Sequence, residues 1–76
     1  MFNLDTLLGG LKAAAQFGGQ ALLHTSEFKS MFDEAVALIH NADDQATAKE
    51  AYHDIMTDND AGFERLDAKL EAAKNS

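Results

Sequence analysis

Residues 25–40, with the sequence TSEFKSMFDEAVALIH, contain the clearest structural signal in the chain. Apolar residues recur there every three or four positions, which is the spacing of one face of an α-helix. This apolar face consists of Phe28, Met31, Phe32, Ala35, Leu38 and Ile39. Thr25 or Ser26 can cap the start of the helix, and Glu27 lies in the first turn, where the helix dipole favours a negative charge. The stretch therefore predicts an amphipathic helix over residues 25–40.

The sequence that follows repeats this pattern twice. Polar residues at 41–44 and at 57–60 supply turns and helix caps, and each cluster is followed by apolar residues at helical spacing. We expect helices over residues 44–57 and 60–74, with one longer helix as the alternative. Ala occurs fourteen times and Leu nine times, whereas Pro is absent and Val and Ile together occur three times, which favours helix over strand. The prediction is a single all-α domain, residues 1–76, built as a small bundle of three to four short helices.

Residues 3–23 form a Gly/Ala-rich N-terminal segment with a helical pattern of its own. Asn3 or Asp5 can cap this helix. Its apolar face consists of Leu4, Leu7, Leu8, Leu11, Ala15 and Leu22. Glycine pairs at positions 9–10 and 18–19 interrupt the segment, although each glycine in a helix interior costs about 0.5–1 kcal/mol relative to alanine. Four glycines in one helix need a structural reason.

Two interpretations of these glycines remain open. In the first, the helix is continuous, and Gly10, Ala14 and Gly18 form a stripe of small residues on which another helix can pack closely. In the second, the pair at 18–19 ends the helix as a C-cap, and a second short helix begins after it.

The small size of the chain favours association with another protein. A chain of 76 residues can bury only roughly 60% of its unfolded surface, and without cysteine it has neither disulfides nor a cysteine-based zinc site. We therefore predict a non-enzymatic interaction or assembly module that self-associates or docks on a larger protein through its N-terminal helix. The predicted protein interface consists of Leu7, Gly10, Leu11, Ala14, Phe17 and Gly18. The alternative is that these residues pack inside the protein's own core.

The charge of −7 is distributed unevenly. Residues 1–26 carry one acid and one base, whereas residues 27–76 carry twelve acids and five bases. Phosphate backbones and anionic membrane surfaces repel such a chain, so we expect no direct binding to nucleic acid. The uncharged stretch at 13–26 is shorter than the roughly 20 residues that a membrane-spanning helix requires. Membrane contact by residues 1–23 is therefore only a weaker alternative.

The acidic half of the chain suggests a second hypothesis about function. Its candidate surface consists of Asp43, Asp44, Glu50, Asp54, Asp58 and Asp60. Carboxylates on one surface can occupy a basic groove in place of phosphates, so the alternative function is an acidic inhibitor of a nucleic-acid-binding protein. Ordinary solvated helix faces account for the same residues.

No spacing in the sequence indicates a catalytic, cofactor or metal site. Residues 58–62, DNDAG, begin like a calcium loop, but Gly62 falls where a ligand belongs and Lys69 falls at the position of the terminal glutamate. The spacing of the three histidines does not suit a shared metal ion, and no nucleophile is placed beside a base. We therefore expect no enzyme activity, no cofactor and no bound metal.

No motif in the chain identifies a protein family. In size and general character, as a very short Cys-free and Pro-free helical chain with a Gly/Ala-rich start, it is similar to small accessory or minor virion proteins of bacteriophages. This similarity implies an accessory or minor structural role. The start of the sequence does not resemble a secretory signal, because Asp5 precedes the first basic residue, Lys12. The expected location is the cytoplasm, or the virion if a phage encodes the chain.

Overall fold

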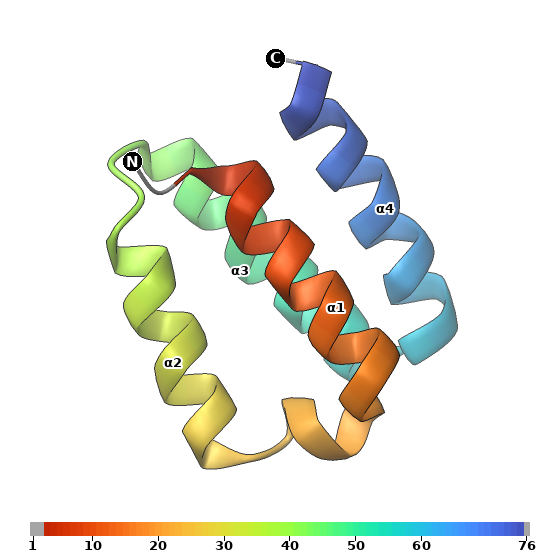
Figure 1. Ribbon diagram of the computed structural model, residues 1–76. Helices are drawn as coiled ribbons and strands as arrows, with labels where there is room; N and C mark the ends of the chain where they lie inside the picture. The colour runs from red at the N-terminus through yellow and green to blue at the C-terminus, as the bar shows by residue number, and fades with distance from the viewer. Residues whose placement is uncertain (1–2, 76) are drawn as a thin grey trace.

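The computed structural model describes residues 3–75, which form four α-helices and no strand (Figure 1). The helices are α1 (Leu4–Leu23), α2 (Ser26–Ala37), α3 (Ala42–Thr57) and α4 (Asn59–Asn75). The predicted all-α bundle is confirmed, and each predicted helix begins and ends within three residues of its expected bounds.

Polar side chains cap all four helices. Asn3 caps α1, Thr25 caps α2 and Asn41 caps α3, each with a side-chain oxygen that accepts a hydrogen bond from a backbone N–H in the first turn. Asp58 caps α4 by accepting a hydrogen bond from the Ala61 N–H at 3.2 Å. Asp58 itself is extended (φ −146°, ψ 107°), so the alternative of one longer helix is wrong. α3 begins two residues earlier than predicted because its cap is Asn41.

The helices surround one apolar core, but they contribute to it unequally. α1 lies across α3, with α4 on one side and α2 on the other (Figure 1). α1, α3 and α4 contact one another extensively, whereas α2 contacts only α1 and α3. The largest fully buried side chains are Leu8, Leu11, Leu23, Ile55 and Leu66, and none of them belongs to α2. α2 is therefore an edge helix.

α1 is kinked at Gly19, so the interpretation of an unbroken N-terminal helix is wrong at this residue. Gly19 has φ 61° and ψ −161°, a conformation that is essentially restricted to glycine. The kink shifts the helical register of the residues that follow. As a result Leu23 is fully buried, while Leu22, which the sequence placed on the apolar face, is 38% exposed. The second glycine pair therefore serves to turn the chain toward α2.

The apolar face of α2 is only partly buried, in contrast to the prediction. Phe28 and Phe32 are buried, as is Val36, which was not predicted. Met31 and Leu38 were predicted to be apolar-face residues, yet both are exposed. The physical reason is the edge position of α2, because no other helix of residues 3–75 covers its outer side.

Gly62 lies at the closest approach of α3 and α4. A Cβ atom at this position would meet the backbone carbonyl of Asp54 and would lie 2.6 Å from the Cα of Ile55. These are backbone atoms that cannot rotate away, so only glycine fits here. The expected break between the two helices is present at Asp58, but α4 already begins at Asn59, and the packing role of Gly62 was not predicted.

Candidate protein-binding surface

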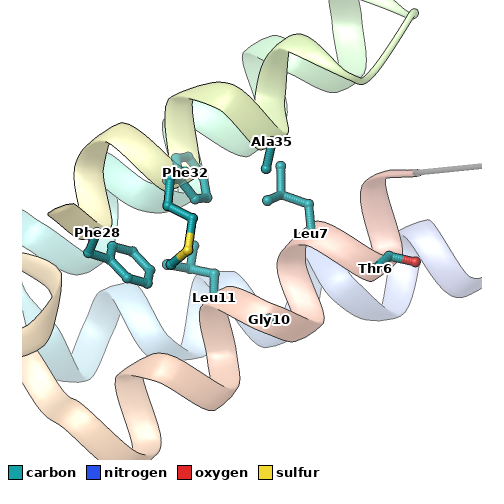
Figure 2. Close-up of a pocket in the computed structure, with 8 residues that line it drawn as sticks. Thr6, Leu7, Gly10, Leu11, Phe28, Phe32 and Ala35 are labelled. Atoms are coloured by element: carbon teal, nitrogen blue, oxygen red, sulfur yellow. The ribbon is translucent and has the colours of Figure 1, made fainter.

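An apolar groove between α1 and α2 is the candidate functional site (Figure 2). Its volume is about 200 Å³, and it is lined by Thr6, Leu7, Gly10, Leu11, Phe28, Met31, Phe32 and Ala35. In Figure 2 the side chain of Leu7 points toward Ala35, and the Phe28 ring projects from α2 toward α1. No charged residue lines the groove, so its walls favour apolar ligand atoms.

The outward face of α1 beside the groove is uncharged. Asp5 and Lys12, the charged residues of α1, are seven positions apart and therefore lie on one face of the helix. Lys12 Nζ lies 2.9 Å from Asp67 Oδ1, so that charged face points toward α4. Gly10 and Phe17 are also seven positions apart, share a different face and are exposed. The groove therefore continues onto a neutral surface of α1.

Large apolar side chains are exposed on α1, on α2 and at the C-terminal end of α2. Phe17 is 91% exposed, Met31 61% and Leu38 59%, and they account for all but one of the large apolar side chains exposed in residues 3–75. Met31 lies in α2, and Leu38 is the C-cap residue that directly follows this helix. We refer to the groove together with Phe17 and Leu38 as the docking surface. Exposed apolar surface that gathers beside a groove is typical of a protein-interaction site.

A cluster of aromatic rings holds α2 against α3 behind the groove. The ring centroid of Phe32 lies 6.4 Å from that of Phe28 and 4.8 Å from that of Tyr52, the latter pair in an edge-to-face arrangement. The Tyr52 hydroxyl donates a hydrogen bond to the Leu23 carbonyl oxygen at 2.6 Å. Burial, and secondly the negative charge of Asp33, raise the pKa of Tyr52 above its usual value, so this hydroxyl stays a donor. Phe32 thus connects the groove wall to the core.

The structure brings only part of the predicted interface together. Leu7, Gly10 and Leu11 line the groove, with both leucines buried at its base. Ala14 is half-buried against the core, and Phe17 lies outside the groove on the docking surface. The sequence did not predict that α2 forms the other wall of the groove, because Met31 has the helical spacing of a core residue. A signal was present, since the apolar stripe of α2 is broader than an edge helix can bury.

The two glycines of the small-residue stripe on α1 make no close contact with another helix of residues 3–75. A Cβ atom at Gly10 would have no neighbour within 4 Å, so the alternative that this glycine packs in the protein's own core is wrong. Gly18 immediately precedes the kink, and a Cβ there would meet the side chain of Leu22 in the same helix. Ala14 is the one member of the stripe that packs against the core.

Several of the predicted acidic-surface residues have local partners. Asp54 Oδ2 lies 3.2 Å from Arg65 Nε and 3.4 Å from Lys69 Nζ, and Lys69 also pairs with Glu50 at 3.2 Å. Asp58 caps α4. The remaining three occupy the first turns of two helices, Asp43 and Asp44 in α3 and Asp60 in α4. The acidic-inhibitor hypothesis stays a prediction.

The ion pairs of Asp54 lead to a pH-dependent contribution to stability. Burial alone would raise the pKa of Asp54, but the hydrogen bond from Lys69 and the charge of Arg65 outweigh it, so the pKa lies below its usual value. In the unfolded chain an aspartate has a pKa of about 3.9. Asp54 therefore stabilises the fold above this pH and loses its contribution as the pH falls through the lower folded value.

Replacing Asp54 by asparagine is expected to lower the free energy of unfolding by about 0.5–1 kcal/mol at pH 7. The difference in free energy of unfolding between this variant and the wild type should be smaller at pH 3. At that pH, protonation of Asp54 removes the same charge from the wild type. Urea denaturation followed by circular dichroism at both pH values measures this. Glu64→Gln, at an exposed position with no ion pair within residues 3–75, is the control and should change stability little at pH 7. A difference for Asp54→Asn that is equal at both pH values would contradict the prediction.

A second groove, between α2 and α3, has mixed chemistry. Its lining includes Lys29, Asp33 and Lys49 beside the aromatic ring of Tyr52. Both signs of charge therefore line this groove, together with apolar and aromatic side chains. Among residues 3–75, no group of three or more His, Cys, Asp or Glu side chains is arranged to hold a metal ion.

Comparison of the chain with protein families, with curated proteins and with solved structures gives no match. None of the helices in residues 3–75 combines the length and apolar character needed to cross a membrane. The geometry of the docking surface is therefore the basis for assigning a function.

Proposed function

We propose that the protein is a non-enzymatic helical interaction module that binds another protein chain at the docking surface between α1 and α2. The observation that carries the proposal is an apolar groove whose α2 wall includes Met31, a large apolar side chain that is 61% exposed. In a chain with a net charge of −7, both walls of this groove are free of charge. Exposing such a surface to water is unfavourable, and covering it with a partner removes that cost.

The shape of the surface suits a helical partner. Two roughly antiparallel helices form its walls, so the groove runs along them (Figure 1). An amphipathic helix laid along such a groove inserts side chains at positions i, i+3 or i+4, and i+7. Met31 on one wall is flexible and adapts to the shape of different side chains. Gly10 on the other wall allows a partner backbone to approach closely.

The test is a titration with a short uncharged amphipathic peptide that carries leucine on one face and glutamine on the other. We expect backbone amide shifts in nuclear magnetic resonance spectra to concentrate in residues 7–17 and 28–38. Met31→Gln should weaken binding about tenfold, because it removes roughly 1.4 kcal/mol of apolar contact. Leu22→Gln, an exposed apolar residue outside the docking surface, is the matched control and should leave the affinity unchanged. Shifts spread over α3 and α4, or equal effects of both substitutions, would refute the proposal.

A further inference from the structure

We infer that the occupant of the docking surface is a basic amphipathic helix of a different protein, rather than a second copy of this chain. This inference rests on the proposed function and adds the chemistry of the partner. It follows from the charges that border the groove on each side.

Two glutamates border the groove on the α2 side. Glu27 precedes Met31 by four positions and Glu34 follows it by three, so both lie on the face of α2 that carries Met31. They are seven residues apart, which corresponds to about 10.5 Å along the helix. Both are exposed, and neither forms an ion pair with another residue of the described chain, 3–75. These carboxylates are therefore available to a partner.

The α1 side of the groove offers no counter-charge to these glutamates. Lys12 is the one base of α1, and its ammonium group is paired with Asp67 on the α4 side. The neutral face of α1 therefore contributes apolar contact alone. The whole surface consists of an apolar floor, one neutral border and one acidic border.

A second copy of the chain fits this surface poorly. Its own docking surface would bring Glu27 and Glu34 toward the same two residues of the first copy, with no base to separate them. Each copy also carries a net charge of −7, so association would be opposed over a longer range. A basic partner is attracted both by the two glutamates at the groove and by the net negative charge of the chain. This charge complementarity steers its approach and selects it over neutral or acidic competitors.

The expected partner segment has a definable pattern. It is a helix with an apolar stripe at i, i+3 or i+4, and i+7, and with Lys or Arg along one flank. Two of these bases should lie about seven residues apart, to match the spacing of Glu27 and Glu34.

The experiment compares three peptides that share one leucine face and differ only along one flank, where they carry lysine, glutamine or glutamate. Isothermal titration against the full chain should show the lysine peptide binding about tenfold more tightly than the glutamine peptide, and the glutamate peptide binding most weakly. The lysine preference should largely disappear at 1 M salt, where the screening length is only about 3 Å.

Paired substitutions locate the effect on the protein. Glu27→Gln combined with Glu34→Gln should abolish most of the preference for lysine over glutamine. Glu64→Gln combined with Glu71→Gln removes the same charge from exposed positions of α4 and should preserve the preference. Circular dichroism of each variant shows whether it remains folded, and the ratio of two affinities measured on one variant does not depend on the fraction folded.

The outcomes separate the two proposals. If no peptide binds in the groove, the proposed function fails and this inference fails with it. If all three peptides bind equally, or if both double variants lose the preference to the same degree, the proposed function stands and the basic partner is refuted. A dimer seen by light scattering that is dispersed by Met31→Gln would also refute the basic partner, because the second copy would then be the occupant.

Discussion

Gly62→Ala is expected to destabilise the protein by about 3 kcal/mol, although alanine is the better helix former by about 0.5–1 kcal/mol. The new methyl group would overlap the Asp54 carbonyl and would lie 2.5 Å from its carbonyl carbon. These atoms belong to the backbone of α3, so the only relief is a displacement of α4 away from α3. Steric overlap therefore outweighs helix propensity at this position.

The effect of Gly62→Ala should be visible in simple unfolding experiments. A domain of this size has a stability of only about 3–5 kcal/mol, so a loss of 3 kcal/mol leaves a large fraction unfolded at room temperature. Urea denaturation monitored by circular dichroism measures the shift of the midpoint. Gly9→Ala is the matched control, because Gly9 is helical and a Cβ there would have no neighbour within 4 Å. The control should gain about 0.5–1 kcal/mol, and an equal gain in both variants would contradict the close contact of α3 and α4.

The fold was predictable from the sequence because its determinants are local. Thr25 caps α2 by a hydrogen bond within the first turn, and the apolar spacing that follows is a property of that helix alone. The two glycine pairs are a feature whose conformation the local sequence does not determine. Gly9 and Gly10 remain helical, whereas Gly19 adopts a positive φ. The sequence offered a break at 18–19 as one of two interpretations and did not decide between them. The difference depends on the direction in which the chain must turn to bury Leu23, which is a tertiary requirement.

The α1 wall of the groove contains three residues that the sequence singled out, although their role in an interface stays a prediction. Leu7, Gly10 and Leu11 were assigned to an interface from the unusual composition of the N-terminal helix, and they line the groove. The α2 half was not assigned, because Met31 has the same spacing as the buried Phe28. Whether such a residue is covered depends on how many helices surround α2. That number follows from the packing of the whole bundle and not from the pattern of α2.

Phe32→Ala is expected to release α2 from the bundle and so to remove the groove. Removing a buried phenylalanine costs about 3–5 kcal/mol. Phe32 lines the groove toward α1 and contacts Tyr52 of α3, the two helices that α2 contacts. Because α1, α3 and α4 pack together without α2, the loss should act first on α2 as local unfolding. Hydrogen exchange should show residues 26–37 losing protection by about a hundredfold or more, and α3 losing much less.

The contrast with Met31→Ala makes the role of Phe32 testable. Met31 belongs to the same helix and the same groove, but its side chain is largely exposed, so its truncation should change stability by less than about 0.5 kcal/mol and leave α2 protected. The two residues then separate the two requirements of the proposed function: Phe32 keeps α2 in place, and Met31 is proposed to contact the partner. Uniform loss of protection in all four helices of Phe32→Ala would mean that α2 is an integral part of the folding unit. Binding at the groove would then require the whole bundle, and not only the attachment of an edge helix.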